Sequence, residues 1–216
     1  MKQCMSNAID WTATGSMLQG IGTNVGSLAV LAAALIGANT FKGWRKQQFA
    51  ARRAQEAEEI LRATYKARDA LAQIRSPLIS GYELDRAEET LGKNERWEGE
   101  LKAKQARMRT TQAYYNRLSH HESEMEALDA VLPMARALFG EELESAVRKL
   151  RHQFWIVQID AESYIDDNGS DQDFTKKIRK GMYRIFDDEN EVTIAINGSV
   201  QIIESTCLPV LRLEAR

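Results

Sequence analysis

The chain has 216 residues, 28% of them charged and 44% hydrophobic, a length that suits one domain or one domain with an appendage. Its 29 Lys and Arg residues nearly balance its 31 Asp and Glu residues, and a net charge of −2 argues against a dedicated nucleic-acid binder. Two cysteines, Cys4 and Cys207, are too few for a multi-cysteine zinc site and indicate a reducing compartment. Three prolines beside abundant Ala, Glu, Arg and Leu favour an all-α fold.

The charged residues are unevenly distributed along the chain. None occurs between Asp10 and Lys42, a gap of 31 residues. The next twelve residues carry five positive charges and no negative one, and we call these five the basic collar: Lys42, Arg45, Lys46, Arg52 and Arg53. After Arg53 the chain has 23 positive against 30 negative residues. The order is therefore an uncharged segment, a basic collar and an acidic body.

The uncharged segment contains a stretch long enough to cross a membrane. Residues 21–41 would form a helix of about 30 Å, the thickness of the hydrocarbon core. We predict a transmembrane helix here, after a short extracytoplasmic tail at residues 1–20, with the lipid bilayer as a partner. A cleaved signal peptide fits poorly because the basic residues follow the apolar run. A buried helix of a soluble core is the other alternative, although glycines are costly in such a helix.

The basic collar predicts the orientation of this span. Lys and Arg residues close to a span mark its cytoplasmic end. We therefore expect the N-terminus outside and residues 42–216 in the cytoplasm. The acidic body and its low cysteine content also agree with a cytoplasmic location.

Small residues recur at four-residue spacing within the span, at Gly22, Gly26, Ala29, Ala33 and Gly37. Such a stripe lets two helix backbones approach closely in lipid. It predicts a homo-oligomer, with the alternative that Gly and Ala are simply common in spans.

The collar and a long antiparallel helical hairpin are expected to occupy residues 42–118. The first arm continues from Lys42 to a stop at Ser76-Pro77 and carries a coiled-coil-like seam. The second arm is predicted for residues 83–118. The seam consists of Ile60, Thr64, Ala67, Leu71 and Ile74.

The second arm contains a basic block that is free of acidic residues. In a hairpin of matched arms this block would return toward the collar and face lipid headgroups. An ordinary solvated face is the alternative, and nucleic-acid binding is less favoured. The block that we expect at the membrane surface consists of Lys102, Lys104, Arg107 and Arg109.

Residues 119–216 are expected to complete a helical bundle that packs on the hairpin. Residues 123–139 form a helix that Pro133 should kink or restart, and Gly140 can close it. Residues 143–164 show the clearest helical spacing and should lie at the centre of the bundle. A loop at 166–173, with Ser170 and Asp173 as a capping box, should precede a helix over 174–186. Residues 190–207 fit either a helix or an Asn-Gly hairpin, and the helix is favoured.

The sequence contains no strong catalytic or metal-binding pattern. His120, His121 and Glu124 supply a His–Glu pair at helical spacing but lack a third ligand, and the acidic loop at 166–173 does not have EF-hand spacing. No phosphate-binding glycine loop occurs. We therefore predict a non-enzymatic protein without cofactor or metal. Trp155 points away from the expected core residue Phe154 and is a candidate anchor for a cytoplasmic protein partner.

Three segments resemble a family of bacterial membrane proteins to which no activity is attached: YKARDALAQIRSPL at 65–78, MARALFGEELE at 134–144 and HQFWIVQ at 152–158. The resemblance covers most of the chain after Lys42. It implies a single-pass protein of the bacterial inner membrane with a helical cytoplasmic body, and it transfers no catalytic residue.

The leading functional hypothesis is a membrane-anchored scaffold or sensor whose cytoplasmic body binds a partner. The alternative is a membrane-perturbing effector, such as a toxin or a phage-defence component, whose spans oligomerise on a cytoplasmic signal.

Overall fold

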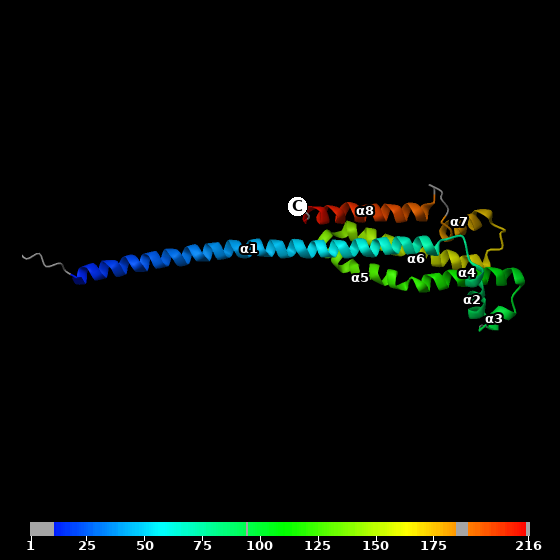
Figure 1. The fold of residues 1–216 in the computed structure, drawn as a ribbon. Coiled ribbons are helices and arrows are strands. Elements are labelled where there is room, and N and C mark those ends of the chain that lie inside the picture. The colour runs from blue at the N-terminus through cyan, green and yellow to red at the C-terminus, as the bar shows by residue number, and fades with distance from the viewer. Residues whose placement is uncertain (1–10, 94, 185–189, 215–216) are drawn as a thin grey trace, which may run out of the picture. The chain divides into compact units, whose positions relative to one another are not determined.

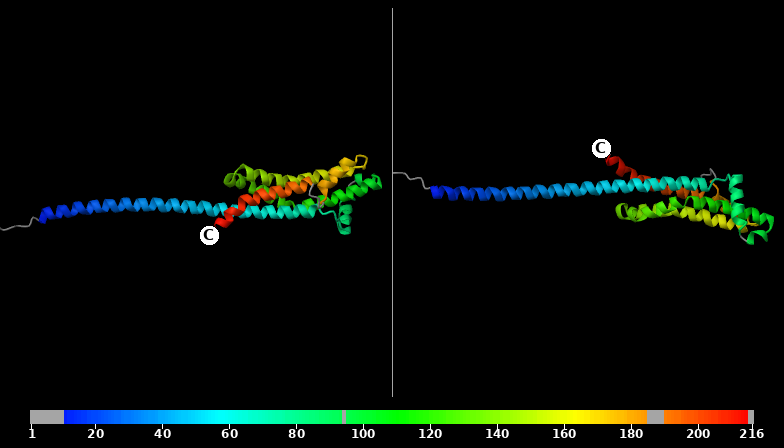
Figure 2. Two further views of the ribbon diagram at one scale, coloured as in Figure 1. Left: turned by 90° about the horizontal axis from the view of Figure 1, so that it is seen from above. Right: turned by 60° about the horizontal axis from the view of Figure 1, so that its bottom comes forward.

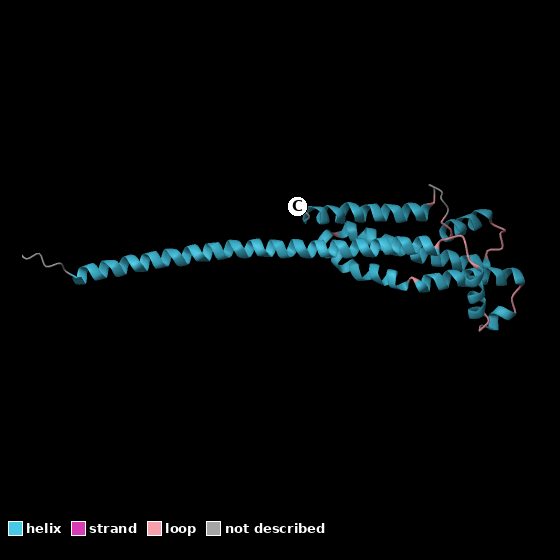
Figure 3. Cartoon of the chain, in the orientation of Figure 1, coloured by secondary structure: helices cyan, strands magenta, loops and turns pink. Residues whose placement is uncertain are grey.

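The computed structural model describes residues 11–93, 95–184 and 190–214, and side chains before Thr40 only at Val30, Ala33, Ala34, Ile36 and Gly37. Within these ranges the chain is helical and has no strand (Figures 1 and 3). The all-α prediction is therefore confirmed. The helices are α1 (Trp11–Ile74), α2 (Gly81–Leu91), α3 (Glu95–Glu98), α4 (Lys102–His120), α5 (Glu122–Phe139), α6 (Glu141–Asp166), α7 (Gln172–Met182) and α8 (Glu191–Glu214).

Helix α1 is a single helix of 64 residues. It includes the predicted span at 21–41, the basic collar and the first arm of the predicted hairpin, and it begins at Trp11, inside the predicted tail. The chain divides into two compact units, residues 1–51 and residues 52–216. In the first unit the large apolar side chains that are described lie exposed on α1: Val30, Ile36, Phe41, Trp44 and Phe49.

Within the described residues, α8 is the helix long and apolar enough to cross a membrane, with a mean hydropathy of 1.3 over Glu191–Arg212. Most side chains of residues 21–41 lie outside the described set, so the N-terminal span stays a prediction. Packing in the core accounts for the apolar character of α8, because the helix contributes a row of buried residues: Val192, Ile196, Val200, Ile203 and Cys207. Its opposite face is exposed and includes Asn197, Gln201 and Ser205.

The core of the second unit forms around α1 and α6. All five residues of the predicted seam on α1 are fully buried. Helix α6 packs against α4, α5, α7 and α8. This agrees with the prediction that residues 143–164, with their clear helical spacing, lie at the centre of the bundle. Helix α8 lies alongside α6 and reaches α1 through a hydrogen bond of 2.9 Å from Tyr65 Oη to Glu204 Oε1 (Figure 2). The long apolar pattern of α6 is thus satisfied by neighbours on several sides.

The predicted hairpin is wrong in its second arm, although its antiparallel direction is right. Arg117 near the end of α4 donates to the carbonyl of Ile74 at the end of α1 (3.1 Å). The Arg53 guanidinium lies 5.0 Å from the ring centroid of Phe139 at the end of α5. The return arm is therefore α4 followed by α5. Gly92 and Gly99 flank α3 and interrupt the expected helix, since glycine is a poor helix former.

This arrangement removes the basis for a basic block that returns to the collar. Lys102, Lys104, Arg107 and Arg109 lie in the first half of α4, at the Ile74 end of the second unit and opposite to Arg53. Three of them bind neighbouring parts of the body. Lys104 pairs with Glu100 (3.1 Å) and Asp166 (3.5 Å), Arg107 Nε donates to the Ile165 carbonyl (2.8 Å), and Arg109 pairs with Glu88 (2.8 Å).

The remaining helix ends follow the predictions in part. Helix α5 continues through Pro133, and Gly140 closes it with a φ of +95°. The N-cap of α7 is Asp171, whose Oδ1 accepts from Asp173 N and Phe174 N (both 3.0 Å). The predicted capping box of Ser170 and Asp173 is therefore wrong, because the cap lies one residue later and its N3 residue is Phe174, which has no side-chain acceptor. Helix α7 also ends at Met182, before the predicted 186. Residues 190–207 are helical from 191, as favoured.

Candidate functional site

Arg117 on α4 joins three helices at the Ile74 end of the second unit. Its Nη1 donates to the carbonyl of Ile74, the last residue of α1 (3.1 Å), and to that of Ser76, just after this helix (2.8 Å). Its Nη2 donates to the carbonyl of Leu78 (2.7 Å). Its Nε and Nη2 also bind the two carboxylate oxygens of Glu83, at 2.6 and 3.2 Å. All five N–H groups of this guanidinium are therefore in use.

Glu83 is also fixed by hydrogen bonds with Ser80, at the start of α2. It is the third residue of α2, and its carboxylate accepts from Ser80 N (2.8 Å) and Ser80 Oγ (3.0 Å), while Ser80 Oγ accepts from Glu83 N (3.3 Å). This is a complete capping box at the start of α2. The hydrogen bond from Arg117 has the largest effect on the Glu83 carboxylate and, together with the bonds from Ser80, lowers the pKa of Glu83 to about 2.

Arg75 is a second arginine that binds helix ends, and only 2% of it is exposed. Its Nε donates to the Gly181 carbonyl (2.9 Å), and its Nη2 donates to the carbonyls of Lys180 (3.0 Å) and Tyr183 (3.1 Å). Its Nη2 also binds Asn190 Oδ1 (3.0 Å), which caps α8 by accepting from the amide N–H of residue 193 (3.0 Å). Burial lowers the pKa of Arg75 to about 10, so the side chain stays charged at neutral pH.

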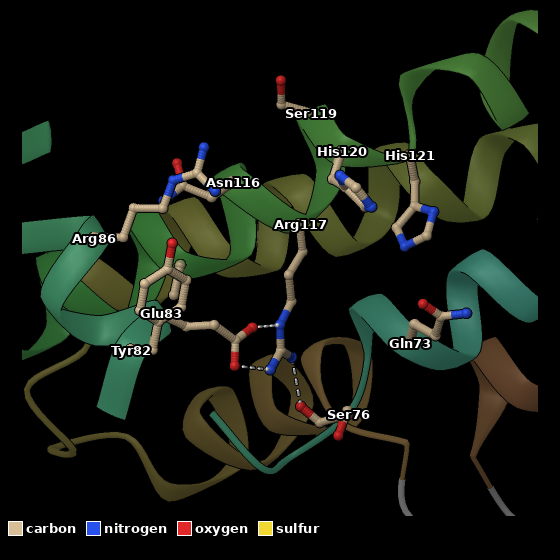
Figure 4. A pocket seen from close by; sticks show the side chains of 11 residues that line it. Gln73, Ser76, Tyr82, Glu83, Arg86, Asn116, Arg117, Ser119, His120 and His121 are labelled. Atoms are coloured by element: carbon tan, nitrogen blue, oxygen red, sulfur yellow. Dashed lines mark hydrogen bonds and ion pairs between the residues drawn. The ribbon is translucent and has the colours of Figure 1, made fainter. Parts of the chain in front are cut away.

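A cavity of about 660 Å³ opens beside Arg117, and we call it the Arg117 cavity (Figure 4). Arg117 and Ser76 lie along its floor. Tyr82 and Arg86 come from α2 on one side and Gln73 from α1 on the other. Asn116, His120 and His121, from the end of α4, complete the wall. Three separate helices therefore contribute polar side chains to one open space.

The histidines of this wall do not form a metal centre. The rings of His120 and His121 lie edge to face with centroids 5.1 Å apart. His121 Nδ1 is buried and lies 3.6 Å from Glu124 Oε2, longer than a hydrogen bond. Among the residues that the structure describes, no three His, Cys, Asp or Glu side chains are grouped as metal ligands.

The predicted partner anchor, Trp155, is not among the residues that line the Arg117 cavity. Trp155 is 51% exposed, whereas its neighbour Phe154 is buried. The ring of His152 stacks on Trp155 with centroids 5.0 Å apart and an interplanar angle of 27°. Ile159, one turn further along α6, is 39% exposed. We call His152, Trp155 and Ile159 the Trp155 strip.

The other predicted site residues are scattered along α1. The positions of Gly22, Gly26 and Ala29 lie outside the residues whose side chains are described, whereas Ala33 and Gly37 are exposed. In the collar, Lys42, Arg45, Lys46 and Arg52 are exposed, but Arg53 is partly buried against Phe139.

Sequence reasoning missed Arg75, Glu83 and Arg117. The Ser80–Glu83 pair was readable, because Ser-x-x-Glu is the signature of a capping box. Arg75 and Arg117 carry no such signal, since each binds carbonyl groups that are brought to it only by tertiary folding. No protein family, curated protein or solved structure matches the chain.

Proposed function

We propose that this protein is a non-enzymatic, single-pass scaffold or sensor of the bacterial inner membrane, with its N-terminus outside and a helical body that binds a cytoplasmic protein. One observation carries the proposal. Helix α1 contains both the uncharged segment and, from Ala54 onward, a buried part of the core. A single helix can therefore serve as anchor and as core element.

Aromatic residues beside the collar support the anchor. Phe41 and Trp44 are exposed, and their ring centroids lie 5.8 Å apart. They flank Lys42 and precede Arg45, at the end of the uncharged segment. Amphipathic aromatic rings next to Lys and Arg are typical of the level of the lipid headgroups, and the positive charge favours the cytoplasmic side.

The Trp155 strip supports a protein partner for the body. Half-exposed tryptophan side chains on a rigid helix are common centres of binding energy in interfaces. The backbone of α6 is fixed by the helices around it, so little ordering of the strip is required on binding. The stacked His152 ring widens the flat aromatic surface that Trp155 offers.

Crosslinking with mass spectrometry on the full-length protein in its native membrane tests this function. We expect a reproducible foreign protein linked near Trp155, and its loss in Trp155→Ala. Phe174→Ala is the matched control, because Phe174 is an exposed aromatic side chain on α7. Links only between copies of this chain, near residues 15–50, would contradict the scaffold.

A membrane-perturbing effector is the second candidate, and the small-residue stripe favours it. Gly37, within this stripe, has open space around it, so a second helix could approach closely there. Overexpression with a membrane-potential dye distinguishes the candidates. Depolarisation that disappears in the Gly22→Leu plus Gly26→Leu variant would favour the effector, and an unchanged potential would favour the scaffold.

A further inference from the structure

We propose that the Arg117 cavity binds a small organic phosphate of about the size of a nucleoside monophosphate, with Arg86 as the residue that binds its charge. The proposal concerns the second unit alone. It requires neither the membrane anchor nor a partner at the Trp155 strip, so it can fail or succeed independently of both.

The charge of the cavity favours an anion. Glu83 is the acidic residue in its wall, and the bidentate pair with Arg117 neutralises it. Arg117 in turn has no N–H left to offer. Arg86 is exposed, and its guanidinium has no hydrogen bond or ion pair within the described part of the chain. The unbalanced full charge in the wall is therefore that of Arg86, and it is available to a ligand.

The hydrogen-bonding groups of the wall point to the same ligand class. Asn116 Oδ1 accepts from Gln112 Nε2 (3.0 Å), which leaves the Asn116 amide N–H groups as free donors. The amide of Gln73 and the ring of His120 supply further donors from α1 and α4. Both oxygens of Glu83 are already occupied. Figure 4 shows Asn116 beside Arg86, so these two side chains can bind the same oxyanion. Gln73 and His120 lie elsewhere on the wall and can bind other polar groups of an organic ligand.

The size of the cavity favours an organic phosphate over the free ion. A volume of about 660 Å³ lies within the range of sites for small organic ligands, and an inorganic phosphate would fill only a small part of it. Tyr82, one turn before Arg86 on α2, lines the cavity and is 74% exposed. Its ring provides an apolar face against which a planar group attached to the phosphate can stack.

The wall is also fixed before any ligand arrives. Arg117 holds the end of α1, the segment before α2 and the start of α2 in one arrangement. Gln73, Arg86 and Asn116 lie on the helices that meet there. A preorganised wall lowers the entropic cost of binding.

Calorimetric titration of the full chain in detergent micelles tests the proposal. The probes are AMP, ribose 5-phosphate, inorganic phosphate and uncharged adenosine, at constant ionic strength. We expect saturable binding of AMP, weaker binding of ribose 5-phosphate and phosphate, and none of adenosine. Arg86→Gln should weaken AMP binding by about tenfold or more, the loss expected for one charge-assisted contact.

Arg62→Gln is the matched control, because Arg62 is exposed on α1 and its ion pair in the described part of the chain is with Glu58, one turn away. It should leave AMP binding unchanged. Since the Arg86 guanidinium has no hydrogen bond or ion pair among the described residues, Arg86→Gln should also leave the melting temperature without ligand unchanged. Absence of saturable binding up to about 10 mM, or equal affinities of Arg86→Gln and wild type, would overturn the proposal. Inorganic phosphate bound as tightly as AMP would overturn its assignment to an organic phosphate.

Discussion

The guanidinium of Arg117 and the carboxylate of Glu83 lie side by side, with Nε 2.6 Å from Oε1 and Nη2 3.2 Å from Oε2. The pair is partly shielded, because the Arg117 side chain is 13% exposed and that of Glu83 is 32% exposed. It connects residues that are 34 positions apart in the chain. Its loss should therefore loosen the junction of α1, α2 and α4.

Glu83→Gln should lower the free energy of unfolding by about 1–2 kcal/mol, since one partner of a partly buried charge-assisted pair is neutralised. Glu88→Gln is the matched control. It breaks the more exposed pair with Arg109, so its cost should be below about 1 kcal/mol. Chemical denaturation of the full chain in detergent measures both, and equal costs would contradict the special role of the Arg117 pair.

The same pair should make stability depend on acid pH. The pKa of Glu83 is lowered from 4.5 to about 2 in the folded chain, so its contribution is complete above about pH 4.5. As the pH falls from 4.5 to 2, the contribution should disappear. The stability difference between wild type and Glu83→Gln should therefore be constant from pH 7 to 5 and vanish near pH 2. A difference that persists at pH 2 would contradict this assignment.

Asp160 should have the opposite effect. Burial raises the pKa of Asp160 to about 6, and this effect is larger than the lowering of the pKa by the positive charges of Lys177 and Arg75. The ionised form is therefore unfavourable in the folded chain. The ionised Asp160 therefore lowers the stability of the folded chain by its full amount above pH 6. This destabilisation disappears as the pH drops toward 3.8, because the carboxyl group is then protonated in the folded chain. Asp160→Asn should stabilise the protein by about 1 kcal/mol at pH 8 and give no gain near pH 4. Thermal unfolding at the two pH values measures the change, and a loss of stability at pH 8 would refute the assignment.

Gly181 on α7 has no room for a side chain. An added Cβ would lie 1.6 Å from Asp160 Oδ2 and 2.6 Å from Asp160 Cγ. Gly181→Ala should therefore cost about 1–3 kcal/mol. Gly198→Ala is the control, since its Cβ would meet nothing within 4 Å and alanine is the better helix former, so a gain of up to about 1 kcal/mol is expected. Thermal unfolding of both variants measures the contrast, and equal effects would show that Asp160 moves aside easily.

Arg75 should be among the costliest residues to replace. Arg75→Met would leave the carbonyls of Lys180, Gly181 and Tyr183 without this donor in a buried place, at a cost of about 3 kcal/mol or more. Arg68→Met is the control, because Arg68 is exposed and its contacts in the described part of the chain are the ion pair with its neighbour Asp69 and a cation–π contact with the Tyr65 ring. Near-UV circular dichroism and denaturant midpoints measure the effect. A cost for Arg75→Met as small as that for Arg68→Met would contradict its role.

The sequence predicted those parts of the fold that depend on local periodicity. The seam from Ile60 to Ile74 and the row from Leu143 to Ala161 are buried, because helical spacing places them on one face. The same reasoning failed at residues 83–118, where a patchy apolar pattern was extended across Gly92 and Gly99 as one helix. Local spacing carries little information about such breaks when polar residues dominate.

The candidate site was less predictable than the fold. The predicted basic block of α4 was expected at the membrane surface, yet Arg107 donates to the carbonyl of Ile165 on α6. Further along α4, Arg117 donates to the carbonyl of Ile74 on α1. A guanidinium that binds a backbone carbonyl needs no acidic partner in the sequence. Trp155 was recognisable because its position beside Phe154 on a strongly periodic helix fixed its direction outward.

The hydrogen bonds of Arg75 have a consequence for any movement of α1. A displacement of this helix by one residue along its axis moves each position by about 1.5 Å and turns it by about 100°. The guanidinium of Arg75 would then leave α7 and Asn190 in the same step, and the cap of α8 would lose its support. Arg75, directly after the end of α1, thus couples the register of α1 to the positions of α7 and Asn190, in addition to the buried seam and the Tyr65–Glu204 hydrogen bond.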